Sequence, residues 1–466
     1  AVCLAELENR CRTGRKLTLM HRMAAVYYLT MYMEAPVTPS ERIQRLSDWS
    51  LAHSGSVVER AFSDKQREAL AAVATTLDCW DANDPNVRRR MLYISGKPGS
   101  GKSEVLVHAA VRAAREHLRT RVLCPTGALV HTYRDRLPDC ENIDVETVHA
   151  GFAIYREADK VCQYAPPTRL RKYELFLLDE ASQIDDSVAQ RLFAALLEMP
   201  QQPTIVMAAD FQQLNPIQGG RYMKRVCEDA RTIELDTIFR TNDEELLRFC
   251  NAIREKQPQK RTVRDFFGTR QWGCSIEEAV AKSLRMAQQR GEPFMWLCVA
   301  NKGAERINMA ALSALRIKIP KDALPGDPKV CATRIVLRVG LCLRLTRNLD
   351  KTRGFCNGAL CTVHTVLSPG AFVAKLSSGP LVLVHPIGTA TDLVFWPCVD
   401  GYATTIRRAQ GSSVTLGGLY FDHVYPPDRG YGYVAVSRFR TREGVHLFGP
   451  VTVSYTHLTL PTNREV

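Results

Sequence analysis

The sequence predicts an α/β fold in which parallel strands are covered by helices on both faces. Short apolar runs typical of buried strands stand at residues 91–95, 121–124, 175–178 and 204–208. After the first run, apolar residues recur at helical spacing at Val107, Val111, Ala114 and Leu118. Continuous apolar strands that alternate with helices are typical of a parallel sheet. Polar groups follow directly after three of the runs, at the sheet edge where such proteins place their active sites.

The first α/β unit is expected at 61–235, and both ends of the chain lie outside the predicted units. Residues 1–60 are predicted to be a helical accessory segment without a chemical motif. Residues 453–466 look foreign to the fold, and we expect them to be a non-native tail. The chain starts with Ala1 rather than Met, which is compatible with a piece of a longer protein.

A second α/β unit is predicted at 236–333 and 400–449, interrupted by a β-rich insertion. Its first strand is expected at 295–300 and the following helix at 303–315. Residues 334–399 alternate in polarity, are rich in Val and Leu, and are divided by several glycines and by Pro386. This pattern predicts a small β-barrel-like insertion at 334–399.

The net charge narrows the kinds of partner. It is formally +13, which favours polyanions because each neutralised phosphate releases counterions. A basic surface without a polyanionic partner would give the same charge. No apolar stretch is long enough to cross a bilayer, so no membrane partner is predicted.

The 15 cysteines are scattered and form no C-x-x-C pair. We therefore expect reduced thiols in an intracellular compartment rather than a disulfide framework. Cys356, Cys361 and His364 are close in sequence, but no second ligand pair follows at zinc-like spacing. They are predicted to be strand residues rather than metal ligands.

A phosphate-binding loop follows the first predicted strand. The segment Gly96-Lys-Pro-Gly-Ser-Gly-Lys-Ser103 matches the pattern G-x-x-x-x-G-K-[ST] in full. Its backbone N–H groups are expected to cradle phosphate oxygens at a helix N-terminus. A chance glycine turn is a poor alternative, because a strand precedes the loop and a helix follows it. The predicted nucleotide-binding residues of this loop are Gly96, Gly99, Ser100, Gly101, Lys102 and Ser103.

An acidic pair supplies the second half of an ATP site. Asp179 and Glu180 follow the apolar run 175–178. Together with a phosphate loop, the Asp is expected to hold Mg²⁺ with Ser103, while Lys102 contacts the β- and γ-phosphates. Glu180 is expected to polarise the attacking water. Alone, such a pair is usually a solvated strand end, so the assignment depends on the phosphate loop.

Further motifs stand in a fixed order along the chain. They are Phe62–Gln66, Pro125–Gly127, Thr147–His149, Ala209–Pro216, Leu235–Thr241, Asn348–Gly358, Thr404–Ser413 and Tyr433–Arg438. Taken in this order, they resemble the PIF-type (petite integration frequency) DNA helicases, in the RecD-like branch of superfamily one. The resemblance runs from about residue 62 to residue 449. It implies two RecA-like P-loop motor domains with parallel sheets, and a small SH3-like β insertion in the second.

The resemblance also implies roles around the nucleotide. Gln66 would read adenine, Gln213 would sense the γ-phosphate, and Gly411 would lie near ATP. Arg240 and Arg438 would be arginine fingers that neutralise charge in the transition state. The implied catalytic set is Lys102, Asp179, Glu180, Gln213, Arg240 and Arg438, with ATP and Mg²⁺ as cofactors.

On the DNA side, the resemblance implies contacts from Thr126, Thr147, His149, Thr405, Arg407 and Arg408. Arg407 and Arg408 replace the family's His and Lys, so charge is kept while a planar fork replaces a point charge. Ala209 and Asn215 replace the family's Gly and Pro. Grip and stepping on DNA are therefore expected to differ from the family's norm.

These resemblances imply an ATP-dependent helicase that moves five-prime to three-prime on single-stranded DNA and unwinds duplexes in replication, repair, recombination or telomere maintenance. Its partners would be single-stranded DNA and duplex junctions, with the monomer as the favoured form. The expected location is intracellular, in the nucleus or mitochondrion of a eukaryote. Two alternatives stay open: an ATP-driven remodeller of protein–DNA complexes, and the helicase module of a mobile-element replication protein. RNA is a less favoured substrate.

Overall fold

The computed structural model describes residues 62–78, 90–157, 160–163, 168–199, 202–216, 219–255, 258–330, 333–350, 353–367, 370–388, 393–422 and 430–449. All elements below belong to one compact unit, formed by residues 55–137 and 141–466. The predicted segments at 1–60 and 453–466 lie outside the described residues. In the described part, no helix is both long and apolar enough to cross a membrane.

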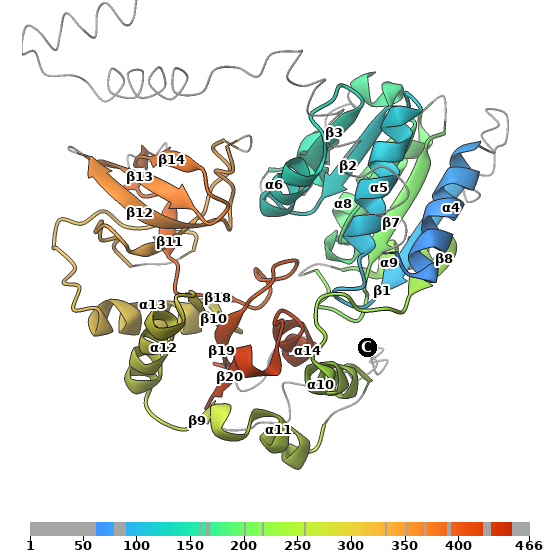
Figure 1. Ribbon diagram of the computed structural model, residues 1–466. Coiled ribbons are helices and arrows are strands. Elements are labelled where there is room, and N and C mark those ends of the chain that lie inside the picture. Colours follow the sequence, from blue (N-terminus) through green and yellow to red (C-terminus); the bar gives the residue numbers. More distant parts are fainter. Residues whose placement is uncertain are drawn as a thin grey trace, which may run out of the picture. The chain divides into compact units, whose positions relative to one another are not determined.

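The first sheet has six strands in the order β3-β2-β6-β7-β1-β8, and every neighbouring pair is parallel (Figure 1). This confirms the predicted parallel sheet and its four apolar runs. The strands are β1 (Met91–Gly96), β2 (Thr120–Cys124), β3 (Ile143–Thr147), β6 (Leu175–Leu178), β7 (Thr204–Ala209) and β8 (Arg231–Leu235).

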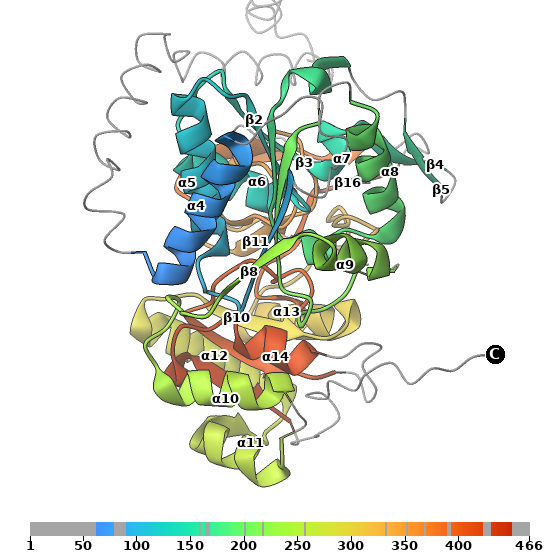
Figure 2. The ribbon, with the colours of Figure 1, turned by 90° about the vertical axis from the view of Figure 1, so that its right-hand side faces the viewer.

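Helices cover both faces of this sheet. Figure 2 shows α4 and α5 on one side of the strands and α8 and α9 on the other. The helices are α4 (Asp64–Asp78), α5 (Lys102–Arg115), α6 (Gly127–Arg136), α7 (Val148–Gly151), α8 (Asp186–Leu197) and α9 (Arg221–Glu228). The prediction for Leu118 is wrong, because α5 ends at Arg115 and Leu118 lies in the loop before β2. Smaller elements are β4 (Ile154–Glu157), β5 (Lys160–Gln163), and the 3₁₀ turns η3 (Thr168–Lys172) and η4 (Ala181–Gln183).

The second parallel sheet has the order β18-β10-β19-β20-β9. Its strands are β9 (Gln271–Trp272), β10 (Phe294–Cys298), β18 (Ala403–Thr405), β19 (Leu416–Tyr420) and β20 (Val445–Phe448). Its helices are α10 (Glu244–Glu255), α11 (Lys260–Phe267), α12 (Ile276–Arg290), α13 (Asn301–Ala314) and α14 (Tyr431–Val436), with 3₁₀ turns η5 (Gly268–Arg270) and η6 (Arg442–Gly444). The strand and helix predicted near 295–300 and 303–315 correspond to β10 and α13.

Alternate residues of β10 feed two different cores. Met295 and Leu297 pack with Leu246 and Phe249 of α10, whereas Phe294 and Trp296 pack with α12 and α13. The central strand is therefore buried on both faces, which explains its continuous apolar sequence.

Between α13 and β18, the chain forms an antiparallel sheet in the order β14-β13-β12-β11-β17. Its strands are β11 (Cys342–Leu345), β12 (Leu360–Leu367), β13 (Ala371–Leu376), β14 (Leu381–Val384) and β17 (Cys398–Asp400), and β15 (Ile387–Gly388) pairs with β16 (Val394–Phe395). The predicted strands at 334–399 are thus present, and the sheet has its own apolar core.

Two of the three residues predicted to lie in a strand, among Cys356, Cys361 and His364, do so. Cys361 and His364 lie in β12, but Cys356 lies in the loop before this strand, so the strand prediction for Cys356 is wrong. The described cysteines are all free thiols. Among the described residues, no group of three or more His, Cys, Asp and Glu side chains could hold a metal ion.

Candidate nucleotide-binding site

The phosphate loop joins the end of β1 to the start of α5. Gly99 and Gly101 have φ angles of 84° and 80°, in the left-handed region that favours glycine. A Cβ on Gly99 would lie 2.4 Å from Cβ of Arg240. The loop and the segment that carries Arg240 are therefore in close backbone contact, and Phe239 N donates to Gly99 O at 2.7 Å.

Lys102 is buried at the first position of α5. Its Nζ donates to Gly96 O at 2.7 Å and to Lys97 O at 3.1 Å. Burial lowers the pKa of its ammonium group, while the carboxylates of Asp210, Glu180 and Asp179 oppose this effect. The side chain is thus a desolvated cation surrounded by oxygen atoms, as a phosphate-binding lysine requires.

Asp179 gathers three donors directly after β6. Ser103 Oγ and Tyr133 Oη each donate to Asp179 Oδ2 at 2.7 Å, and Glu180 N donates to Oδ1 at 2.8 Å. The Ser–Asp pair presents oxygen atoms of the kind that Mg²⁺ prefers. Tyr133 of α6 was missed from the sequence, since only the tertiary fold brings it to the acidic pair.

Glu180 has two unusual features. Its φ angle is 47°, in the left-handed region that non-glycine residues rarely adopt. Its Oε2 is buried and has no hydrogen-bond partner among the described residues. Burial raises the pKa of its carboxyl group, and the neighbouring Asp179 carboxylate adds to this rise. A strained, unpaired carboxyl of this kind is typical of functional sites.

Gln66 lies beside the phosphate loop, at the start of α4. Its Nε2 donates to Ser100 O at 3.3 Å, and its Oε1 accepts from Ser63 N at 3.0 Å. A Cβ on Gly101 would lie 2.2 Å from this Nε2. The predicted adenine reader is therefore fixed against the loop that it is expected to serve.

These groups open onto a cavity of about 460 Å³. Nine of the predicted site residues line it: Gly99, Gly101, Lys102, Ser103, Asp179, Glu180, Arg240, Gly411 and Arg438. Sequence reasoning missed Arg136, Phe239, Ser413 and Arg440, which also line it. Four of the predicted residues, Gln66, Gly96, Ser100 and Gln213, are buried and do not line it.

Two arginines from the later part of the chain face the acidic pair. Arg240 Nη1 donates to Ser437 O at 2.8 Å. Burial and the like charge of Arg438 lower the pKa of Arg240 to about 10. Arg438 is 1% exposed, and its Nη2 lies 3.5 Å from Gln213 Oε1. Two such desolvated cations beside Lys102 favour a bound polyanion in the cavity.

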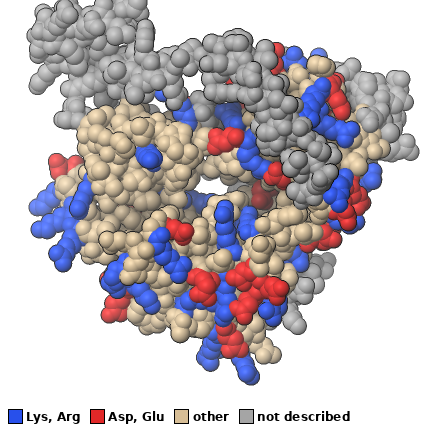
Figure 3. All heavy atoms as spheres, in the orientation of Figure 1, with Lys and Arg blue, Asp and Glu red and all other residues tan. Residues whose placement is uncertain are grey.

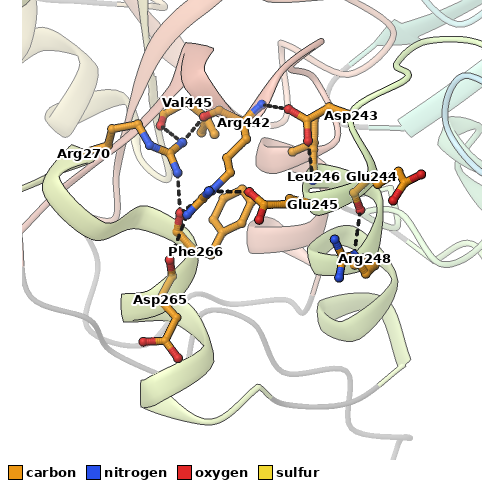
Figure 4. Close-up of polar contacts among 10 residues, drawn as sticks. All are labelled: Asp243, Glu244, Glu245, Leu246, Arg248, Asp265, Phe266, Arg270, Arg442 and Val445. Carbon is orange, nitrogen blue, oxygen red and sulfur yellow. Dashed lines mark hydrogen bonds and ion pairs between the residues drawn. The ribbon is translucent and has the colours of Figure 1, made fainter.

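A polar network fixes the segments that carry these arginines (Figure 4). Asp243 Oδ2 accepts from Arg442 N at 2.6 Å, and its Oδ1 accepts from Leu246 N at 2.9 Å. The Arg442 guanidinium pairs with Glu245 and donates to the carbonyls of Phe266 (2.9 Å) and Asp265 (3.0 Å). One arginine therefore links η6 to the start of α10 and the end of α11.

The residues predicted to contact DNA lie at the carboxyl ends of strands, but they differ in exposure. Thr126, His149 and Arg408 are exposed. Thr147 and Thr405 are 8% exposed, and their hydroxyls accept from Ala150 N at 3.3 Å and from Arg408 N at 3.4 Å. Thr126 caps α6 by accepting from Leu129 N at 3.3 Å.

Arg407 is partly buried. Its guanidinium donates to Asn215 O and lies 6.0 Å from the centre of the Tyr431 ring. Arg407 and Asn215 both depart from the family's pattern, and the structure brings these two residues into contact. On the face of the molecule drawn in Figure 3, Lys and Arg side chains lie among Asp and Glu side chains. Charge alone therefore does not mark a DNA track on this face.

The insertion also contacts the first sheet's helices. His131 Nε2 of α6 lies 3.4 Å from Ser378 Oγ. A Cβ on Gly127 would lie 2.6 Å from Asn348 Oδ1, and one on Gly354 would lie 2.7 Å from His131 Nε2. Both glycines therefore allow a close approach between α6 and the loops of the insertion.

Comparisons with known sequences agree on one group of proteins. A family model described as an AAA domain matches residues 61–267. The Pif1 helicase of Bdellovibrio bacteriovorus is 25% identical over 402 residues, which cover 77% of this chain and 84% of that protein. The RecD2 helicase of Deinococcus radiodurans is 24% identical, covering 76% and 46%, and Xenopus laevis PIF1 is 23% identical, covering 78% and 60%. The chain thus spans about half the length of some relatives.

Solved structures agree with the fold. A Pif1 helicase from Bacteroides in complex with ADP-AlF3 and ssDNA has a TM-score of 0.60 at 19% identity, covering 84% of this chain and 94% of that one. A structure of two coordinating Pif1 helicases at forked dsDNA has a TM-score of 0.61 at 18% identity, covering 86% and 94%. These likenesses and the two parallel sheets described above fit two RecA-like domains.

Proposed function

Because the chain belongs to the Pif1-type family of ATP-dependent DNA helicases, we propose that it uses ATP hydrolysis to move along single-stranded DNA and to unwind duplexes. One observation carries this proposal. The same cavity is lined by the phosphate loop and acidic pair of the first sheet and by Arg240 and Arg438. A γ-phosphate bound between them would link the two RecA-like domains, so its release would change their preferred separation.

In this proposal, ATP is the nucleotide and Mg²⁺ its metal. Lys102 contacts the β- and γ-phosphates, and Ser103 and Asp179 hold the metal. Glu180, whose Oε2 is already desolvated and unpaired, accepts hydrogen bonds from the attacking water. Arg240 and Arg438 stabilise negative charge that develops on the transferred phosphoryl group.

The DNA track is proposed to run past Thr126, Thr147, His149, Thr405, Arg407 and Arg408. The exposed members of this set are the expected phosphate contacts, and the two buried threonines would shape the loops that carry them. Movement is proposed to be five-prime to three-prime, with the sheet at 334–399 acting as an SH3-like insertion. The domain limits proposed above, 61–235 and 236–333 with 400–449, are retained, and the monomer is the proposed active form.

A second candidate is an ATP-driven remodeller of protein–DNA complexes that does not unwind. It is favoured by the contact of Arg407 with Asn215 O, because a side chain held by the protein is less free to grip DNA. The third hypothesis is a helicase module within a larger replication protein. It is compatible with the RecD2 relative, which is about twice as long as the matched region.

Strand displacement tests these readings. Two matched duplexes are compared, one with a five-prime single-stranded tail and one with a three-prime tail, with Lys102→Ala as the inactive control. Unwinding of only the five-prime-tailed duplex supports the proposal in full. Unwinding of only the three-prime-tailed duplex keeps the helicase and overturns the direction. DNA-stimulated hydrolysis without unwinding supports the remodeller instead.

A further inference from the structure

The segment that follows β7 reaches into the second RecA-like domain. Leu214 is 1% exposed and packs in the same core as Leu246 and Ile253 of α10 and Val434 of α14. Asn215 O accepts from Arg407. Leu214 is thus packed in the core of the second RecA-like domain, and Asn215 O is bonded to Arg407 of the same domain. Because of these contacts, a movement between the two domains must act on residues 210–215.

Asp210, at the start of this segment, forms an ion pair with a residue of the second RecA-like domain. Arg254 Nη2 of α10 lies 3.2 Å from Asp210 Oδ1. The Asp210 side chain is 2% exposed and that of Arg254 is 15% exposed, so the pair is largely removed from water. The Arg254 guanidinium also lies 5.8 Å from the centre of the Tyr433 ring, whose hydroxyl donates to Asp210 Oδ2 at 3.5 Å.

Asp210 is in turn connected to the candidate catalytic groups. Gln213 Nε2 donates to Asp210 Oδ2 at 3.5 Å, and Gln213 Oε1 accepts from Arg438 at 3.5 Å. The side chains thus form a continuous chain of contacts from Arg254, through Asp210 and Gln213, to Arg438.

We propose that Arg254 is a positioning residue, which holds Asp210 so that Gln213 and Arg438 face the γ-phosphate. The inference rests on the proposed function. Its physical basis is that a buried carboxylate is destabilised when it loses the cation that pairs with it, so its position changes. Without Arg254, Asp210 loses its ion-pair partner, and the side-chain amide of Gln213, which donates to Asp210, loses its orientation. No motif of the sequence points to Arg254, which lies in an otherwise ordinary helix.

The test compares Arg254→Gln, Arg254→Lys and the matched control Arg248→Gln. Arg248 is an exposed arginine of the same helix, whose Nε donates only to the backbone carbonyl of Glu244 among the contacts drawn in Figure 4. For each variant, kcat and KM for ATP are measured with saturating single-stranded DNA. Affinities for ADP alone and for ADP with aluminium fluoride are measured by titration calorimetry, and Tm reports folding.

In Arg254→Gln, we expect kcat to fall by about 10- to 100-fold, because groups around the transition state lose their orientation. The tighter binding of ADP with aluminium fluoride over ADP alone should be lost, while affinity for ADP alone stays within about twofold. Arg254→Lys, which keeps the charge, should recover part of kcat. Arg248→Gln should behave as the unaltered protein. A purely structural role would lower Tm and both affinities together, and would overturn the proposal.

A double-variant cycle adds a second criterion. If Arg254 acts through Asp210, then Arg254→Gln combined with Asp210→Asn should be no slower than Asp210→Asn alone. Losses that multiply would show that Arg254 acts independently, and would overturn the proposal. A DNA-stimulated ATPase in the unaltered protein together with an unchanged kcat in Arg254→Gln would remove this inference and leave the helicase proposal standing. An unaltered protein without ATPase activity would remove both.

Discussion

The side chain of Glu180 illustrates how burial sets chemistry at a single residue. Its carboxyl lies in a left-handed backbone turn, and its Oε2 has no hydrogen-bond partner in the described part of the chain. Because burial and Asp179 both raise its pKa, the group is a stronger base than an exposed glutamate. The strain of the turn is offset by the tightly packed elements on either side, β6 and η4.

Replacing Glu180 by Gln should therefore remove hydrolysis and leave binding. We expect kcat to fall by about 100-fold or more, since the base is lost while the shape of the cavity is kept. A fluorescent ATP analogue should still bind. In the unaltered protein, kcat should decline as the pH falls through the raised pKa of Glu180, at a higher pH than for an exposed glutamate. A variant that retains most of its kcat would exclude Glu180 as the base.

Asp400 offers a test of stability at the same scale. Its side chain is 2% exposed, and neither carboxyl oxygen has a hydrogen-bond partner among the described residues. Burial raises its pKa from 3.8 to about 7. A raised folded-state pKa means that protonation favours the folded state, so the stability that this group contributes is fully present below about pH 4 and is lost as the pH rises through about 7.

We therefore expect Asp400→Asn to stabilise the protein. The amide keeps the shape without the charge, so the gain should be about 1–4 kcal/mol at pH 8 and smaller at pH 5. Urea unfolding of both proteins at the two pH values measures this difference. An equal effect at both pH values would mean that the charge of Asp400 is not the cause.

Sequence reasoning succeeded for residues whose chemistry is local. Gly96 to Ser103 and the pair Asp179–Glu180 are contiguous, and each follows an apolar run that the chain itself marks. Tyr133 and Arg254 carry no such mark as partners of the site, because their roles depend on which helix packs beside which strand. Arg407 shows the converse, since its motif predicts a DNA contact while the fold gives it a protein partner.

At the scale of elements, the apolar runs identified the four central strands of the first sheet and missed the two at its edges. β3 and β8 were not predicted. Residues of β3 alternate between buried and half-buried, and β8 mixes buried with exposed residues. An edge strand has a neighbouring strand on one side only, so its residues are less completely buried. Its sequence therefore need not be a continuous apolar run. The crossings that place β1 between β7 and β8 likewise depend on packing that no single segment encodes.

The network around Arg442 shows how elements are joined near the cavity. We expect Arg442→Gln to lower the free energy of unfolding by about 1–3 kcal/mol, because the carbonyls of Asp265 and Phe266 lose a charged donor. Glu245→Gln is the matched control. Its ion pair with Arg442 is exposed on the Glu245 side, so its loss should cost about 0–1 kcal/mol.

Urea unfolding followed by circular dichroism measures both effects. Because the Arg442 guanidinium also ties η6, which follows Arg438 closely in the chain, to the end of α11, the ATPase kcat of Arg442→Gln should fall as well. Equal losses of stability in the two variants would mean that the ion pair, rather than the caps on α11, carries the stabilisation.

At the scale of the whole molecule, the proposed unwinding would need the insertion to act together with the first RecA-like domain. The two meet where α6 approaches the loop at Gly354 and the residue Ser378. Since α6 begins directly after Thr126, a proposed DNA contact, this meeting point lies beside the proposed track. Neither Gly354 nor Ser378 lines the cavity that is proposed to hydrolyse ATP. Coupling and chemistry can therefore be separated by a substitution at this contact.

Gly354→Ala is that substitution, and Gly358→Ala is its control. Both glycines have left-handed φ angles, of 80° and 95°, so an added Cβ costs each a similar strain of about 1 kcal/mol. Only at Gly354 would the Cβ also meet His131 Nε2, at 2.7 Å, whereas nothing lies within 4 Å at Gly358. We expect Gly354→Ala to unwind fewer base pairs per ATP hydrolysed, with little change in hydrolysis itself. Strand displacement and phosphate release measured on one tailed duplex give this ratio. If both variants lose the same share of unwinding, backbone strain is the cause, and the contact between α6 and the insertion has no part in coupling.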